Sequence, residues 1–341
     1  MELRTPLCDL LGIEVPILCA GMGSVAGPEL VAAVSEAGGL GVLGVSGASA
    51  EGVRSRIAAT RELTKRPIGA NVIIDEAGWA TSAEDRELVR AEVAAAIEEK
   101  VGVLVLFWGD PAPYVELARG SGVPVLVQVG SLDEAEASAA AGVDGIIVQG
   151  LEAGGHVRAK SSIWDLLPAV VAAVSPLPVL ASGGIGDGAG VARALQLGAQ
   201  GVSLGTRFVA SEESAAHPEY KRRIVESGAK DTVHTEDLYD IYWPGAPTRT
   251  LRNRTFEEWD AAGRPPPGQR PGEGTAVGTL RLPSGEPYEL PRYGGAGSPL
   301  ASFEGDLDYQ AMWAGESVEV VHEVLPAADI VRRLVEDATP A

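Results

Sequence analysis

The chain has 341 residues, 45% of them hydrophobic, which suits one large α/β barrel or two modest domains. Its 27 basic and 47 acidic residues give a formal net charge of −20, which repels nucleic acid and anionic membrane surfaces, so we expect neither as a partner. The 2 cysteines, Cys8 and Cys19, are too few for a disulfide framework or a four-ligand zinc site, so we expect reduced thiols in a cytoplasmic protein.

Short apolar runs alternate with helical stretches over residues 16–227. Apolar runs of this kind are typical of parallel strands buried on both faces, and their alternation with helices implies right-handed βαβ units. The apolar runs are Pro16–Ala20, Gly39–Leu43, Ile68–Val72, Val103–Phe107, Val123–Val127, Gly145–Val148, Val179–Ala181 and Gly201–Leu204. The helical stretches are Pro28–Ala37, Ala50–Thr64, Ala83–Lys100, Pro111–Arg119, Leu132–Ala141, Ile163–Val174, Gly188–Leu197 and Pro218–Ser227. These units predict an α/β fold, a (β/α)₈ TIM barrel, with a doubly wound sheet as the alternative.

No segment of the sequence predicts a membrane protein. The N-terminal segment carries charged residues such as Glu2 and Arg4, so it lacks the apolar core of a signal peptide. The stretch 166–186 has no charged residue, but Pro176 and Pro178 would stop a spanning helix. We therefore expect a buried helix, a turn and a buried strand there, in a soluble protein.

The C-terminal part has a different composition. The segment Gly263–Pro299 is rich in proline and glycine and contains an expected hairpin within Thr279–Leu290. We interpret it as an extended excursion over the barrel surface, before a terminal helix near Ala327–Asp337. The sequence thus predicts a barrel over residues 1–260 and a C-terminal extension over residues 261–341, which packs on the barrel; whether it covers the active site is left open.

Two segments fit the G-x-G-x-x-G/A pattern of dinucleotide-binding loops, beginning at Gly21 and Gly184. That pattern needs an acidic residue at the end of the next strand, and neither Leu43-Gly44-Val45 nor Leu204-Gly205-Thr206 supplies one. A classical NAD site is therefore not expected. Glycine loops after strands 7 and 8 of a barrel often bind phosphate through backbone N–H groups. The alternative is a pair of tight turns without a ligand.

Two other patterns concern serine and histidine chemistry. The run Gly201–Gly205 fits the G-x-S-x-G pattern of a nucleophile elbow, but Ser203 lies inside the predicted eighth strand. A serine hydrolase completed by His217 or His234 is the alternative that this pattern offers. The 4 histidines have no metal-ligand spacing, so we expect no transition-metal site.

His156 ends a glycine-rich loop, Gln149–His156, which leaves the sixth strand at the mouth where barrel enzymes act. A neutral imidazole at this position would act as a general base, and a protonated imidazole would stabilise an anion. The alternative to both catalytic roles is a histidine that only caps the rim of the barrel. Asn71 and Gln128 end apolar strands at the same mouth, where amides suit either a heterocycle or loop backbone.

Larger side chains near the mouth have more ordinary interpretations. Trp108, Trp243 and Trp313 either wall a cavity or pack in the core, and the second is the more common role. Glu152 and Asp187 are expected as loop and helix-cap carboxylates.

At these motifs the chain resembles the nitronate monooxygenase family, formerly the 2-nitropropane dioxygenases, which shares its barrel with FMN-dependent enoyl-ACP reductases. The matching stretches are 16–23 (PILCAGMG), Asn71, 149–156 (QGLEAGGH), 181–188 (ASGGIGDG), 197–208 (LGAQGVSLGTRF) and 312–317 (MWAGES). The resemblance implies bound FMN and His156 as the catalytic residue. The expected FMN-binding residues are Ala20, Gly21, Met22, Asn71, Gln128, Gln149, Gly154, Gly183, Gly184, Ser203, Leu204, Gly205 and Thr206; Gln128 comes from its place at the barrel mouth alone.

The resemblance implies a flavoprotein oxidoreductase that uses O₂ to convert alkyl nitronates to a carbonyl compound and nitrite, with nitroalkanes left open as substrates. The alternatives are an NAD(P)H-dependent enoyl-thioester reductase and a non-catalytic flavin-binding protein; a homodimer is left open. The chain departs from many relatives at Val157-Arg158, where they carry Arg-Gly, and at Glu316, where they carry Gln. Both positions border the expected substrate side, so they leave the substrate undecided.

Overall fold

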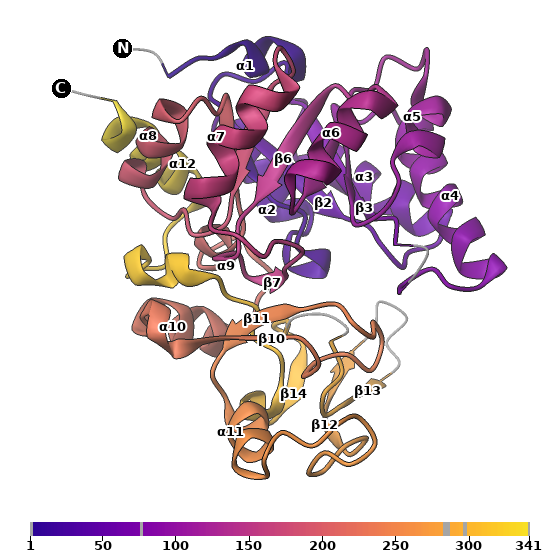
Figure 1. Cartoon of the computed structure of the whole chain (residues 1–341), viewed down its shortest axis with the longest axis vertical. Helices are drawn as coiled ribbons and strands as arrows, with labels where there is room; N and C mark the ends of the chain where they lie inside the picture. Colours follow the sequence, from indigo (N-terminus) through magenta and orange to yellow (C-terminus); the bar gives the residue numbers. More distant parts are fainter. Residues whose placement is uncertain (1–2, 76–77, 282–286, 296–298, 340–341) are drawn as a thin grey trace.

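The computed structural model describes residues 3–75, 78–281, 287–295 and 299–339, and the statements below concern these residues. Two layers are visible in Figure 1, a barrel ringed by helices and a smaller layer of strands and helices below it. The barrel takes most of the chain up to residue 204 and also its terminal helix, and the smaller layer lies against one end of it.

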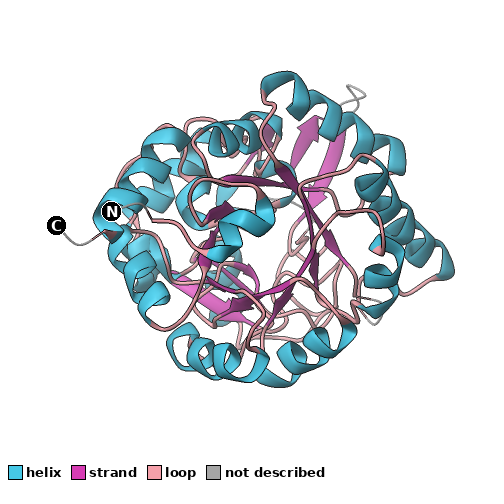
Figure 2. Cartoon of the chain, turned by 90° about the horizontal axis from the view of Figure 1, so that it is seen from above, coloured by secondary structure: helices cyan, strands magenta, loops and turns pink. Residues whose placement is uncertain are grey.

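The parallel barrel strands form one closed sheet, seen end-on in Figure 2. Strand β1 pairs with β9, which closes the ring, with Leu18 opposite Ser203. Since the sheet is closed, the predicted (β/α)₈ barrel is confirmed and the doubly wound sheet is wrong. The strands are β1 (Ile17–Cys19), β2 (Leu40–Gly44), β3 (Ile68–Ile73), β4 (Val103–Phe107), β5 (Val125–Val129), β6 (Gly145–Gln149), β8 (Val179–Ser182) and β9 (Gly201–Leu204).

Apolar side chains from successive strands fill the barrel interior, where Leu18, Val105 and Leu180 are almost wholly buried. Helix α1 (Pro6–Leu11) belongs to the same cluster through Leu7 and Leu11. The interior is thus a packed core, so a ligand site has to lie at a barrel mouth.

Most predicted helices surround the barrel as expected. They are α2 (Pro28–Glu36), α3 (Ala50–Leu63), α4 (Ala83–Glu98), α5 (Ala112–Ala118), α6 (Leu132–Ala141), α7 (Ile163–Val174) and α8 (Gly188–Gln196). The charge-free stretch 166–186 forms the end of α7, a turn and strand β8, as predicted. No helix in the described residues is long and apolar enough to cross a membrane.

The prediction that Pro218–Ser227 supplies the eighth barrel helix is wrong. That segment forms α10 (Pro218–Glu226), which lies in the lower layer and buries only Tyr220 and Ile224. The place between α8 and α2 is taken by the terminal helix α12 (Ala327–Ala338), which buries one apolar stripe including Ile330 and Leu334. A helix with a continuous apolar stripe covers a barrel better than the strongly charged α10 does.

The lower layer is an insertion between β9 and α12. Its strands are β10 (Thr232–Thr235), β11 (Thr248–Leu251), β12 (Ala276–Arg281), β13 (Pro287–Pro291) and β14 (Phe303–Gly305). The same stretch of chain contains the helices α9 (Thr206–Val209), α10 and α11 (Arg254–Ala261) and the short 3₁₀ turns η2 (Ala229–Asp231), η3 (Leu307–Tyr309) and η4 (Glu316–Val320). A further 3₁₀ turn, η1 (Gly23–Val25), follows β1 in the barrel. Strand β11 also pairs with β7 (Gly155–His156), so the insertion is joined to the loop that follows β6.

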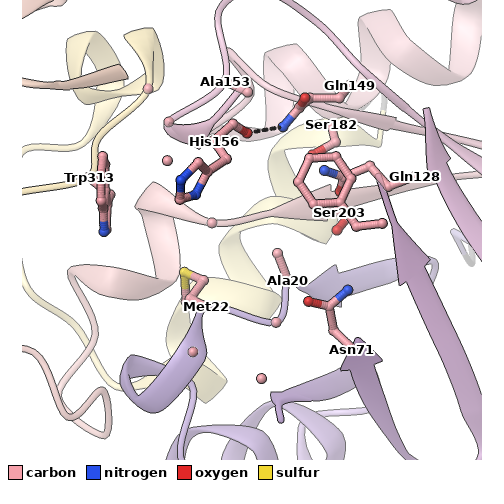
Figure 3. Close-up of a pocket in the computed structure, with 18 of the residues that line it drawn as sticks. Ala20, Met22, Asn71, Gln128, Gln149, Ala153, His156, Ser182, Ser203 and Trp313 are labelled. Carbon is pink, nitrogen blue, oxygen red and sulfur yellow. Dashed lines mark hydrogen bonds between the residues drawn. The ribbon is translucent and has the colours of Figure 1, made fainter. Parts of the chain in front are cut away.

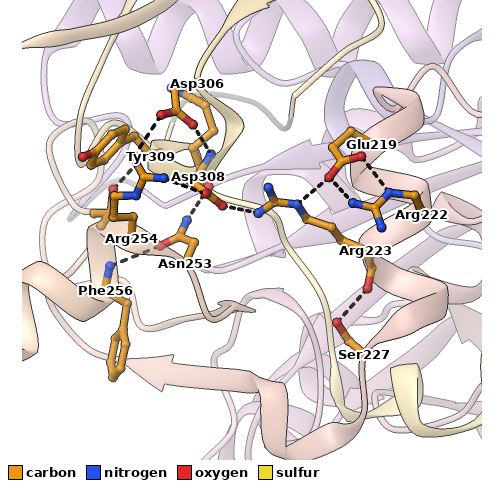
Figure 4. A network of polar contacts seen from close by, with 12 residues as sticks. Glu219, Arg222, Arg223, Ser227, Asn253, Arg254, Phe256, Asp306, Asp308 and Tyr309 are labelled. Carbon is orange, nitrogen blue, oxygen red and sulfur yellow. Dashed lines mark hydrogen bonds and ion pairs between the residues drawn. The ribbon is translucent and has the colours of Figure 1, made fainter.

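The expected hairpin within Thr279–Leu290 is confirmed in its strands, because β12 and β13 pair antiparallel; its turn, 282–286, lies outside the described residues. Figure 4 shows how ion pairs join α10 to η3. Arg223 pairs with Glu219 and with Asp308, and Arg254 contacts Asp308 at 3.2 Å. These partly exposed pairs stabilise only modestly, but they hold α10 within the lower layer. A domain division at residue 260 stays a prediction.

Candidate active site

A cavity of about 430 Å³ lies at the carboxyl end of the barrel strands. Strand ends and βα loops line it from the barrel, and Tyr239, Trp243 and Trp313 line it from the insertion. Every residue predicted for the site lines this one cavity: Ala20, Gly21, Met22, Asn71, Gln128, Gln149, Gly154, His156, Gly183, Gly184, Ser203, Leu204, Gly205 and Thr206. The structure therefore brings all of them together, and their roles toward a ligand stay predictions.

Bare backbone lines the end of the cavity next to β8 and β9. Gly183 and Gly184 follow each other with φ of +97° and +70°, which residues with a Cβ rarely adopt. A Cβ on Gly205 would meet only Met22 Sδ, at 3.6 Å, so it would project into open space. The N–H groups of Gly184, Gly205 and Thr206 donate to no acceptor in the described part of the chain. Such unpartnered N–H groups suit an anion.

The returning C-terminal segment completes this end of the cavity. Gly315 N donates to Thr206 Oγ1 at 3.0 Å, and a Cβ on Gly154 would lie 2.4 Å from Gly315 N. Gly154 is thus required for the close approach of two chain segments. Ser317 also lines the cavity, although it was named only as part of a matching stretch. Glu316 points elsewhere, with its carboxylate 3.1 Å from Arg249.

The side-chain amides of Gln149, Asn71 and Gln128 at the barrel mouth differ in their hydrogen-bond partners. Gln149 uses both ends of its amide on the loop: it donates to His156 O at 2.9 Å (Figure 3) and accepts from Arg158 N at 2.8 Å. Asn71 Nδ2 donates to Val105 O at 3.2 Å, and its Cβ leaves no room for a side chain at Gly21. Gln128 lines the cavity from β5, the strand that pairs with the Gln149 strand β6. Gln149 therefore holds the loop that carries His156.

His156 lies in a box of three indoles, which we call the aromatic box: Trp108, Trp243 and Trp313. Its ring centroid is 4.3 Å from that of Trp243, 5.4 Å from Trp313 and 6.5 Å from Trp108. Trp108 has φ of +66°, an uncommon conformation for a bulky residue. Trp243 and Trp313 line the cavity, as the first of the two alternatives held, whereas Trp108 packs behind Trp243 in a buried cluster, as the second held.

The imidazole of His156 is held in its neutral form. Its Nε2 is buried and has no hydrogen-bond partner among the described residues. Burial disfavours the charged ring and lowers the pKa of His156 to about 4. Of the two states that the sequence left open, the structure favours the neutral base in the free protein.

Asp75 holds the aromatic box in place, and sequence reasoning did not identify it. Its Oδ2 accepts a hydrogen bond of 2.7 Å from Trp243 Nε1, and both side chains are buried. A Cβ on Gly78 would lie 2.5 Å from the same carboxylate oxygen, so Gly78 makes room for the pair. The only sequence signal is an acidic residue directly after the apolar run of β3.

The serine hydrolase alternative receives no geometric support. Ser203 is buried within β9, and His217 caps α10 by accepting from Glu219 N at 3.1 Å. The predicted helix cap is confirmed, because Asp187 accepts from Gly190 N at 2.8 Å at the start of α8. Glu152 lies in a loop, as predicted, and accepts from Ile163 N at 3.0 Å. In the residues that the structure describes, no cluster of three or more His, Cys, Asp or Glu is arranged to bind a metal.

Comparison with known proteins gives a consistent result. The profile of the family described as nitronate monooxygenase matches residues 4–337. The nitronate monooxygenase of Paraburkholderia phytofirmans is 33% identical over 370 residues, which cover 97% of this chain and 94% of that protein. FabK from Thermotoga maritima superposes with a TM-score of 0.77 at 32% identity, covering 98% of this chain and 96% of that one. A nitroalkane oxidase from Streptomyces ansochromogenes gives a TM-score of 0.75 at 28% identity, with 97% of both chains covered.

Proposed function

Since the chain belongs to the nitronate monooxygenase family and is therefore a flavin-dependent oxidoreductase, we propose that it binds FMN and oxidises alkyl nitronates or nitroalkanes with O₂ to a carbonyl compound and nitrite. The observation that carries this proposal is the single cavity with two unlike ends. One end presents unpartnered backbone N–H groups, and the other presents a neutral imidazole among indoles.

The residues at the glycine end fit the phosphate of FMN. Gly184 and the segment Ser203–Thr206 would hold it through N–H groups and hydroxyls, without a cationic side chain. Ala20–Met22, Asn71 and Gln128 would contact the ring system. When bound, the flavin supplies the chemistry that takes electrons from the substrate and passes them to O₂.

His156 acts as the general base when the substrate is a nitroalkane. The neutral Nε2 accepts the α-proton, the C–H bond breaks, and its electron pair moves into the nitro group to give the nitronate. A preformed nitronate needs no such step. The aromatic box excludes water from this end, and Gln149 keeps the histidine loop closed through its hydrogen bond to His156 O.

The experiment that tests this proposal is a product balance in air. The purified yellow protein, supplied with butyl-1-nitronate, should consume O₂ and release nitrite and butanal in equal amounts. Oxygen uptake without nitrite, or no uptake by flavin-loaded protein, would contradict the proposed reaction.

A second candidate is an NAD(P)H-dependent enoyl-thioester reductase, which the full-length match to FabK favours. NAD(P)H would then bleach the flavin without oxygen, and a nitronate alone would not. A cytoplasmic location and a homodimer remain predictions from the sequence.

A further inference from the structure

The side chains that line the cavity carry no permanent charge. Among the described residues, none of the lining side chains is Asp, Glu, Lys or Arg. The ranges outside the description, 1–2, 76–77, 282–286, 296–298 and 340–341, contain no Lys or Arg in the sequence. They therefore supply no cationic side chain either. A substrate that carries a carboxylate would find no cationic side chain in this cavity.

The arginines near the aromatic box, Arg158 and Arg249, are committed to other partners, and so is Arg207, which follows Thr206 and donates to Ala210 O and Glu323 O. Arg158 lies over the outer wall, with its guanidinium 5.1 Å from the Trp108 ring centroid and its Nε 2.5 Å from Glu134. Arg249 donates to Leu151 O at 3.0 Å and pairs with Glu316. None of these arginines lines the cavity. Each would have to leave an existing partner to reach a bound anion.

Most polar atoms of the surrounding aromatic side chains already have hydrogen-bond partners. Trp243 donates its N–H to Asp75, and Tyr239 donates its hydroxyl to Asn253 at 3.0 Å. The hydroxyls of Tyr242 and Tyr288 lie 3.1 Å apart and pair with each other. His156 Nε2 remains buried without a partner. This end of the cavity therefore offers few polar contacts, among them His156 Nε2, and they are surrounded by apolar ring faces.

We propose that this end of the cavity selects substrates with a single polar head, the nitro or nitronate group, on an uncharged apolar body, and that it rejects nitro compounds with a carboxylate on that body. This inference rests on the proposed function, because it assigns the head group to the reacting end. An uncompensated charge in such a site reduces affinity by at least about 100-fold. Each additional buried methylene raises it about fourfold.

Four compounds separate charge from size in flavin-loaded protein. We compare kcat/KM for 1-nitropropane, 1-nitrobutane, 3-nitropropionate and its methyl ester, each also as its nitronate. We expect 1-nitrobutane to exceed 1-nitropropane, 3-nitropropionate to fall about 100-fold below 1-nitrobutane, and the neutral ester to recover most of that loss. The difference should persist in about 0.5 M NaCl, where repulsion by the net charge of −20 is screened. Equal or preferred use of 3-nitropropionate would overturn the inference, as would a difference that salt abolishes.

A binding measurement separates failure of this inference from failure of the proposed function. Nitro compounds that enter the aromatic box should quench the fluorescence of Trp108, Trp243 and Trp313. Tight quenching by 1-nitrobutane and the ester, with weak quenching by 3-nitropropionate, would support the inference even if no compound is oxidised. Equal affinity for the acid and the ester would contradict it, whatever the turnover.

A variant can supply the missing cation. Tyr288 is 38% exposed and lines the cavity, so Tyr288→Lys should place an ammonium group at its mouth. We expect the ratio of kcat/KM for 3-nitropropionate to that for its ester to rise at least about tenfold. Leu117→Lys adds the same charge on α5, outside the cavity lining, and should leave the ratio unchanged. A ratio that rises equally in both variants would contradict the inference, because net charge alone would then explain the selection.

Discussion

Replacing His156 by asparagine tests the role of the neutral imidazole. Burial lowers the pKa of His156 from 6.5 to about 4, so charging this ring costs about 3 kcal/mol more than in water. The imidazole is therefore available as a base throughout the neutral range. With a nitroalkane, His156→Asn should reduce kcat/KM by about 10²–10⁴-fold, the usual contribution of a general base. With the matching nitronate, which is already deprotonated, the loss should be below about tenfold.

Paired assays of nitrite release from 1-nitrobutane and butyl-1-nitronate, from about pH 4 to pH 8, measure this difference. In the unchanged protein, kcat/KM for the nitroalkane should fall only as the pH approaches the pKa of about 4. His217→Asn is the matched control, because an asparagine also caps a helix and His217 lies outside the cavity lining. An equal loss for both substrates, or a fall in activity centred near pH 6.5, would refute the assignment of a neutral base.

Three further predictions concern the glycine end of the cavity, the support of Trp243 and the pH dependence of folding stability. Gly205→Val should fill the open space at the glycine end of the cavity, so the protein should fold but remain colourless. The control Gly52→Val, on the outer helix α3, should stay yellow. Visible absorbance measures the bound flavin and circular dichroism measures the fold. Asp75→Asn should weaken the anchor of Trp243 and lower kcat about tenfold with little change in melting temperature, which steady-state kinetics and calorimetry measure. Burial raises the pKa of the Glu92 carboxyl to about 8 in the folded protein. Between about pH 4.5 and pH 8 the unfolded chain has lost this proton while the folded protein still holds it, so the free energy of unfolding falls as the pH rises. Glu92→Gln should remove this loss, on the order of 5 kcal/mol by urea unfolding, and an unchanged pH slope would contradict the assignment.

The barrel could be predicted because strands buried on both faces leave continuous apolar runs, and each predicted run overlaps an observed strand. The cavity residues could be predicted because parallel strands bring their carboxyl ends to one mouth. Asn71 and His156 thus meet there although they lie on different βα units.

Contacts between distant segments could not be predicted in the same way. Asp75 and Trp243 are 168 positions apart, and no local pattern pairs them. The eighth helix was misassigned because α10 is the next helix in the chain, whereas packing of an apolar stripe decides which helix covers the barrel. The bonds of Gln149 to its own loop depend on how that loop folds back, which the residues between Gln149 and Arg158 do not reveal.

The central claim is that one cavity holds a flavin with its phosphate on backbone N–H groups and its ring beside His156. An anaerobic titration of the purified yellow protein with butyl-1-nitronate tests it most directly. The account predicts that the nitronate alone bleaches the flavin, that air restores the colour with release of nitrite, and that the extracted pigment is FMN. A flavin that only NAD(P)H bleaches, or a protein that stays colourless after incubation with FMN, would contradict it.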